Sequence, residues 1–73
     1  MPDITYEIRA HIGTLSQSAS GWQKELNLIS WNEREPKYDL RDWSPDHQKM
    51  SKGITLTKEE LLALKTLLNS IEI

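Results

Sequence analysis

The first regular pattern in the chain is an alternation of apolar and polar residues between Ile4 and Ile12. The even positions of this segment are aliphatic or aromatic, and the odd positions are polar or charged. A period of two with polar partners is typical of a half-buried antiparallel strand. A small polar segment, residues 16–21, then breaks the pattern and indicates a turn. We therefore expect a first strand at about residues 4–15.

Three later segments are predicted as strands, at about residues 22–31, 37–43 and 52–56. The second strand carries Leu26 and Leu28 on one face, and the third carries Tyr38 and Leu40. Pro36 suits a strand start, because proline has no amide to donate to the ladder. These strands, followed by a helix, predict an α+β fold with a strongly curved four-stranded antiparallel sheet.

The hairpin of the second and third strands has a register that gathers its aliphatic residues. Placing Trp31 opposite Lys37 also places Leu28 opposite Leu40, and a shared apolar face fixes the register of a half-buried sheet. The other face then pairs Ile29 with Asp39, Asn27 with Arg41 and Glu25 with Trp43. The predicted consequence is an exposed face that holds Trp31, Lys37, Arg41 and Trp43.

The C-terminal segment predicts a helix at about residues 58–70. Thr57 and Glu60 have the spacing of a capping box, and the segment from Leu61 is rich in strong helix formers. Its apolar residues fill an arc of roughly 160°, whereas one sheet-facing stripe needs about 100°. We therefore expect the helix to pack twice, once on its sheet and once in a homodimer. The alternative is a helix sunk deep into the curved sheet. The expected interface residues are Leu61, Leu64, Leu68 and Ile71.

Length and composition limit the class of protein. The 73 residues predict one domain, residues 1–73, with a thin core, and the absence of cysteine excludes disulfides and thiolate zinc sites. No apolar run approaches the ~20 residues that span a bilayer, and no signal peptide is visible. We expect a cytoplasmic, nucleoid-associated protein that needs no cofactor and no metal.

The middle of the chain interleaves large aromatics with cations. All three tryptophans lie there, together with six of the nine Lys and Arg residues. Such a combination suits single-stranded nucleic acid, because rings stack on bases while cations hold phosphates. The net charge of −2 and the six acids of the same stretch weigh against a general basic surface. The candidate binding residues are Trp22, Lys24, Asn27, Trp31, Arg34, Lys37, Arg41, Trp43, Lys49 and Lys52.

Other interpretations of these residues stay open at this point. The tryptophans can form the core of a small domain, and a Lys or Arg stacked on Trp can be a structural cation–π pair. An exposed Trp face can also dock a partner protein, since interface cores favour Trp, Tyr and Arg. Four residues resemble a loose metal cluster, but turn residues and solvated charges explain them better: Asp39, Asp42, Asp46 and His47. Enzymatic chemistry has no visible set of residues.

Several phrases of the sequence resemble the transcriptional positive coactivator four (Whirly-like) family. The family segments are matched by residues 37–43, Lys-Tyr-Asp-Leu-Arg-Asp-Trp, and by residues 52–56, Lys-Gly-Ile-Thr-Leu, before an amphipathic helix. The small bacterial YdbC-type members are similar over nearly the whole chain. The phrases that carry this likeness are residues 25–31, 34–39 and 43–47.

The resemblance implies four antiparallel strands and one helix, with dimerisation through the helices. It also implies binding of single-stranded DNA with little sequence preference, in transcription, replication or repair. Trp31 matches the family's aromatic at the end of the second strand, and Arg41 matches a basic residue of the third. The coactivator's own Trp lies one position later than Trp43, at Ser44. Single-stranded RNA is the alternative ligand, and transcription or replication proteins are the expected further partners.

Overall fold

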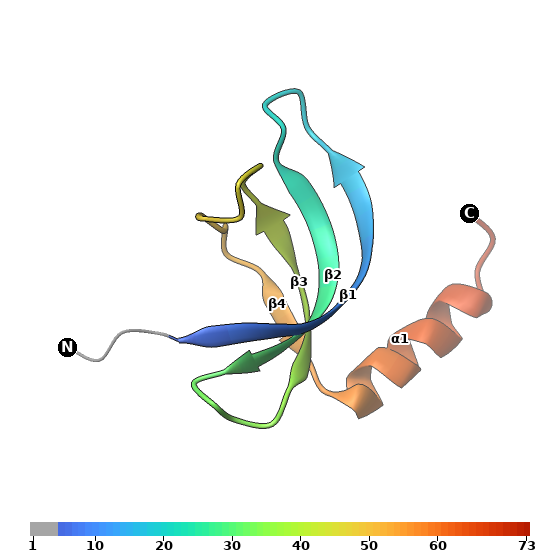
Figure 1. Cartoon of the computed structure of the whole chain (residues 1–73). Coiled ribbons are helices and arrows are strands. Elements are labelled where there is room, and N and C mark those ends of the chain that lie inside the picture. The colour runs from blue at the N-terminus through green and yellow to red at the C-terminus, as the bar shows by residue number, and fades with distance from the viewer. Residues whose placement is uncertain (1–4) are drawn as a thin grey trace.

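The computed structural model describes residues 5–73. Its elements are β1 (Tyr6–Gln17), β2 (Gln23–Trp31), β3 (Lys37–Trp43), β4 (Ile54–Leu56) and α1 (Lys58–Asn69). The strands form one antiparallel sheet in the order β1-β2-β3-β4, and α1 follows it at the C-terminal end (Figure 1). The predicted four strands and C-terminal helix are therefore confirmed. The predicted start of the first strand, Ile4, lies outside the described residues.

Three β-bulges interrupt the alternation predicted for β1. The pairing of β1 with β2 shifts between Ile8 and Ala10, between His11 and Gly13, and again between Thr14 and Ser16. A bulge inserts one unpaired residue, which bends the strand and changes which face the next side chain occupies. His11 therefore shares a face with Ile8, although the strict alternation placed it opposite. β1 bends visibly along its length (Figure 1).

The register of β2 with β3 differs by two residues from the predicted one. Lys37 pairs with Ile29 and not with Trp31, and Leu40 pairs with Leu26 and not with Leu28. The segment between the paired residues Ile29 and Lys37 contains Asn32 and Glu33, which adopt left-handed backbone conformations, with φ of 51° and 63°. A shift of two keeps every side chain on its predicted face.

The two faces of the β2–β3 hairpin have different neighbours. The tryptophan face consists of Glu25, Asn27, Ile29, Trp31, Lys37, Asp39, Arg41 and Trp43, and the leucine face consists of Leu26, Leu28, Tyr38 and Leu40. The apolar side chains of the leucine face are only half-buried, whereas Ile29 and Trp43 on the tryptophan face are fully buried. The small core thus lies on the opposite face from the one that the aliphatics predicted.

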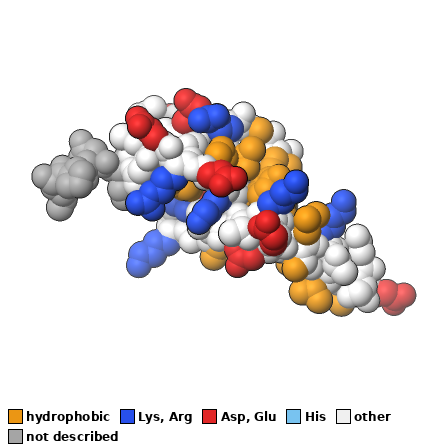
Figure 2. All heavy atoms as spheres, turned by 90° about the horizontal axis from the view of Figure 1, so that it is seen from below, with side chains coloured by type: hydrophobic (Ala, Val, Ile, Leu, Met, Phe, Trp, Pro, Cys, Tyr) orange, Lys and Arg blue, Asp and Glu red, His pale blue; other side chains and the backbone are white. Residues whose placement is uncertain are grey.

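Helix α1 begins with the predicted capping box. The Thr57 hydroxyl accepts from the Glu60 amide at 3.1 Å, and the Glu60 carboxylate accepts from the Thr57 amide at 2.8 Å. Among residues 58–69 none is buried, and Leu67 is 63% exposed. Figure 2 shows apolar side chains along the surface of the helix. Across residues 5–73, no helix is both long enough and apolar enough to cross a membrane.

A close approach of β3 to the start of β4 requires glycine at position 53. A Cβ atom at Gly53 would clash with Cβ of Arg41 and with the carbonyl oxygen of Leu40, whereas a Cβ atom at Gly13 would meet nothing within 4 Å. We expect Gly53→Ala to lower the free energy of unfolding by about 1–3 kcal/mol through overpacking. Urea unfolding measures this effect. Gly13→Ala is the matched control, and equal stability losses in the two variants would contradict the prediction.

Candidate functional site

A row of aromatic rings crosses the tryptophan face. The ring of Tyr6 lies 5.6 Å from that of Trp31 and 5.6 Å from that of Trp43, and the imidazole of His47 stacks on Trp43 at 5.5 Å. These distances are typical of favourable aromatic pairs. Tyr6 is 39% exposed and Trp31 is half-buried, so the end of the row formed by these two rings is open to solvent.

Trp43 differs from the prediction, because it is fully buried and not exposed. The chain turns back over the tryptophan face after β3, and this turn, residues 44–49, brings His47 onto the indole. Tyr6 contributes a second ring contact. Trp43 is thus a core residue of the single chain. Among residues 5–73, its indole N–H and that of Trp31 are buried without hydrogen-bond partners, so no hydrogen bond orients either indole.

Arg41 is held in place by a buried ion pair. Its Nε and one terminal nitrogen each donate to the Asp39 carboxylate at 2.6 Å, and the side chain of Asp39 is 0% exposed. The guanidinium carbon also lies 4.7 Å from the centre of the Trp31 ring. The cation–π alternative is therefore present for this pair. Arg41 fixes one side of the Trp31 ring and is only 13% exposed, so a large part of its charge is neutralised within the protein.

A hollow of about 350 Å³ opens beside Trp31. Its walls come from the β2–β3 loop, from β3 and from β4, and consist of Trp31, Asn32, Arg34, Glu35, Lys37, Arg41 and Thr55. Arg34 and Lys37 are exposed, and Lys37 lies on the tryptophan face. The hollow thus combines an aromatic ring with two solvent-exposed cations. We call it the Trp31 hollow.

The remaining predicted binding residues lie in several places. Lys24 is exposed but belongs to the leucine face, and Asn27 is buried at 1% exposure. Trp22 is half-buried just before β2 and does not line the Trp31 hollow. Lys49 and Lys52 are exposed in the connection between β3 and β4. The structure therefore brings together only Trp31, Arg34, Lys37 and Arg41.

The turn after β3 is stabilised by side-chain hydrogen bonds. The Asp46 carboxylate accepts from the Gln48 amide at 3.0 Å and from the Ser44 hydroxyl at 2.8 Å. These two bonds lower the pKa of Asp46, because both favour its charged form. The Ser44 hydroxyl also accepts from the Lys49 amide. Such local bonds set the position of His47 and Lys49.

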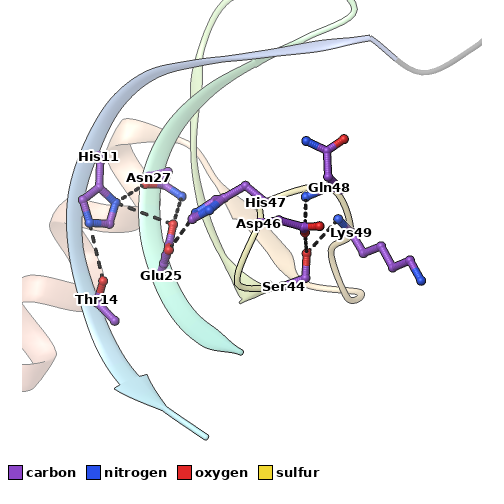
Figure 3. A network of polar contacts seen from close by, with 9 residues as sticks. All are labelled: His11, Thr14, Glu25, Asn27, Ser44, Asp46, His47, Gln48 and Lys49. Atoms are coloured by element: carbon purple, nitrogen blue, oxygen red, sulfur yellow. Dashed lines mark hydrogen bonds and ion pairs between the residues drawn. The ribbon is translucent and has the colours of Figure 1, made fainter. Parts of the chain in front are cut away.

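A buried polar network joins this turn to β1 and β2 (Figure 3). The Glu25 carboxylate, 3% exposed, accepts from Nε2 of His47 at 2.9 Å and from the amide nitrogen of Asn27 at 3.2 Å. Nδ1 of His11 lies 2.7 Å from the Asn27 oxygen and 3.6 Å from the carboxylate. Within residues 5–73, no group of side chains is arranged to hold a metal ion.

The sequence interpretation missed the partners of these buried charges. The sequence pattern predicts a solvated charge at Asp39 and gives Glu25 no role beyond its predicted pairing. The spacing of Glu25 with Asn27, and of Asp39 with Arg41, is i to i+2, which places each pair on one face of a strand. This spacing is the sequence signal from which the two side-chain pairs could have been predicted. His47 could not be found in this way, because it reaches Glu25 across 22 residues.

Removing charge from Asp39 tests whether the ion pair fixes Trp31. We expect Asp39→Asn to lower the free energy of unfolding by about 1.5–3 kcal/mol, the contribution of hydrogen bonds to charged groups. Denaturant unfolding gives this value, and tryptophan emission reports the environment of the indole. Asp42→Asn is the matched control, because Asp42 lies on the leucine face. A stability loss for Asp39→Asn no larger than that of the control would refute this role.

Comparisons with known proteins agree with this arrangement. The family model described as Transcriptional Coactivator p15 (PC4) matches residues 18–67, which include β2, β3, β4 and most of α1. The chain is also 55% identical over 71 residues to an uncharacterized protein of Treponema pallidum (strain Nichols), a match that spans 97% of this chain and 84% of the relative. Because the family model matches well over half of the chain, this protein belongs to the transcriptional coactivator p15 (PC4) family.

Proposed function

We propose that the protein binds single-stranded DNA on the tryptophan face, with little sequence preference. The observation that carries this proposal is the Trp31 hollow, where a half-exposed indole lies beside the exposed cations Arg34 and Lys37. A base stacks on the side of the ring that Arg41 leaves open. Family membership is consistent with this function. The bacterial relative further supports a place among the small bacterial, YdbC-type members.

The charges divide between structural and binding roles in this proposal. Arg41 is committed to Asp39 and acts mainly by orienting Trp31. Arg34 and Lys37 contact phosphates at the hollow, and Lys49 and Lys52 lie in the connection that leads to β4. Acidic and basic side chains are interspersed on the surface shown in Figure 2, so binding depends on local cations and not on overall charge.

The exposed ring of Tyr6 extends the stacking surface. It contacts Trp31 at 5.6 Å, is 39% exposed, and lies directly opposite Trp31 in the sheet. The buried Trp43 packs against the Tyr6 ring and does not itself contact a base. Bending of the strands allows a flexible single strand, and not a rigid duplex, to follow the face. Single-stranded RNA offers the same bases and phosphates, and a matched RNA oligonucleotide distinguishes the two ligands.

A homodimer through α1 belongs to the same proposal. Leu64, Leu67, Leu68 and Ile71 are between 38% and 63% exposed in one chain. A groove of about 320 Å³ between the helix and the leucine face is lined by Leu26, Leu61, Leu64 and Leu68. The helix of a second copy fills this groove. Two tryptophan faces in one particle then raise the apparent affinity for a long strand by avidity.

Substitutions at the Trp31 hollow test the binding function. We expect Trp31→Ala to weaken binding of labelled oligo-dT by about 5- to 150-fold, which corresponds to about 1–3 kcal/mol for loss of one stacked base. Lys37→Ala should weaken binding and reduce the slope of log affinity against log salt concentration by about one. Fluorescence anisotropy at two salt concentrations measures both effects. Lys24→Ala, a cation of the leucine face, is the matched control.

The same titration separates the proposed function from its rival. Contacts between cations and phosphates make the affinity fall steeply as salt rises, because binding releases counterions from the strand. An apolar surface that docks a partner protein would show little affinity for oligo-dT at any salt concentration. Unchanged affinity in a folded Trp31→Ala variant would rule out the stacking site. The absence of oligonucleotide binding at low salt would overturn the function itself.

Introducing a charge among the expected interface residues of α1 tests the proposed dimer. We expect the wild-type protein to sediment as a dimer and Leu68→Glu to sediment as a monomer, because a buried unpaired carboxylate opposes association. Analytical ultracentrifugation measures the mass. Leu62→Glu adds the same charge at a leucine that is 53% exposed and is not among the expected interface residues, so this variant should stay dimeric. A monomeric wild type, or two variants of equal mass, would contradict the proposal.

A further inference from the structure

A second hollow lies on the tryptophan face, toward the other end of β2 from Trp31. It has a volume of about 210 Å³ and is lined by Ile8, His11, Gln23, Glu25, Asn27 and His47. We call it the histidine hollow. Glu25 and Trp31 are six positions apart on β2, which corresponds to about 20 Å at about 3.3 Å per residue. A single strand that stacks on Trp31 and extends along β2 reaches this hollow.

The chain contains two histidines, and both of them contact the Glu25 carboxylate. Nε2 of His47, in the turn after β3, lies 2.9 Å from one carboxylate oxygen, and Nδ1 of His11, on β1, lies 3.6 Å from the other. Figure 3 shows the two imidazoles directed at Glu25 from these separate segments. The carboxylate is 3% exposed, whereas the side chains of His11 and His47 are 52% and 44% exposed. One shielded carboxylate thus serves two imidazoles that reach solvent.

The net charge of this cluster depends on proton uptake by the two imidazoles. Imidazole is the side chain whose ordinary titration lies near neutral pH, and the chain has no cysteine. With both imidazoles neutral, the cluster carries the negative charge of Glu25. One proton makes the cluster neutral, and a second makes it positive, because one carboxylate neutralises one imidazolium. The positive charges then lie on the exposed rings, while the negative charge lies beneath them.

Among residues 5–73, the nearest charged groups of β3 and of the turn keep a constant charge near neutral pH. Arg41 lies opposite Glu25 in the sheet, but its guanidinium donates to Asp39. Within the turn, hydrogen bonds from a backbone amide and from a hydroxyl lower the pKa of Asp46, so this carboxylate stays charged. The positive charge of Lys49 favours the same state. The local charge therefore changes through the two imidazoles.

We propose that the histidine hollow is a second phosphate subsite of the tryptophan face, and that proton uptake at His11 and His47 makes it attract the strand. This inference rests on the proposed binding of single-stranded DNA and adds a regulation by pH to it. A phosphate beside the rings stabilises their charged form. This effect does not depend on which ring nitrogen faces the strand, because both nitrogens of an imidazolium share the charge. Binding and proton uptake thus favour each other, since coupling between two ligands is reciprocal.

The affinity for oligo-dT should therefore rise as pH falls through the range in which imidazoles titrate. Neither thymine nor a phosphodiester takes up a proton in this range, so the change reports on the protein. We expect about 2- to 25-fold tighter binding at about pH 6 than at about pH 8, because one exposed ion pair contributes about 1.5- to 5-fold and two imidazoles take part. Fluorescence anisotropy at low salt measures this ratio, and circular dichroism verifies the fold at both pH values.

Glutamine at both histidine positions isolates the contribution of the cluster. His11→Gln and His47→Gln keep an amide donor for Glu25 but take up no proton. The double variant should bind oligo-dT with nearly equal affinity at the two pH values, and it retains the amino terminus, which titrates in the same range. Lys37→Ala is the matched control, because it belongs to the Trp31 hollow. It should weaken binding at both pH values and leave their ratio unchanged.

Proton NMR of the wild-type protein provides a test that needs no substitution to fold. The two imidazole Cε1–H resonances titrate separately, and the midpoint of each titration should move to higher pH when oligo-dT is added. A wild-type affinity that is independent of pH, midpoints that do not move, or a pH ratio that persists in the folded double variant would overturn the inference while the proposed function stands. Failure of the wild type to bind oligo-dT at either pH would overturn both.

Discussion

The buried pair between Asp39 and Arg41 is the contact on which the tryptophan face depends. Two charges leave water here, and the arrangement is tolerable because two parallel hydrogen bonds of 2.6 Å join them. The guanidinium then covers one side of the Trp31 ring. Gly53 allows the chain before β4 to approach Arg41 closely. The Arg41 side chain thereby connects the β2–β3 hairpin, the start of β4 and the half-exposed indole of Trp31.

This domain holds polar residues in its interior and leaves the leucines of its helix exposed, and both features favour association through the helix. Glu25, Asn27 and Asp39 occupy interior positions that apolar residues would fill in a larger core, while the leucines of α1 stay at the surface. A chain of 73 residues buries a smaller fraction of its surface than a large domain does. Association through the helix would bury more apolar area without replacing the polar network that orients the tryptophan face.

The family likeness and the residue-level geometry support different statements. The match to the coactivator family establishes membership and is consistent with binding of single-stranded DNA. The geometry separates cations with a structural partner from cations that are exposed, and this separation singles out Arg34 and Lys37 at the Trp31 hollow. It also shows a second hollow on this face, lined in part by His11, Glu25 and His47.

The local patterns in the sequence determined the elements and the faces of the strands. Alternation predicted the first strand, short apolar segments predicted the other three, and the Thr57–Glu60 spacing predicted the helix start. The parity of β2 and β3 placed Trp31 with Lys37 and Arg41. These features could be predicted because they depend on residues that are near in sequence. The three bulges of β1 and the shift of two in the β2–β3 register escaped the pattern, since an extra loop or strand residue leaves no periodic trace.

Only the tertiary structure decided which of these residues are buried. Trp43 and Trp31 have the same parity, but the turn after β3 folds back over one indole and leaves the other half-exposed. Likewise, Glu25 becomes an interior group because His11 and His47 reach it from β1 and from that turn. Periodicity specifies the direction of a side chain, whereas its burial depends on segments that come from elsewhere in the chain to cover it.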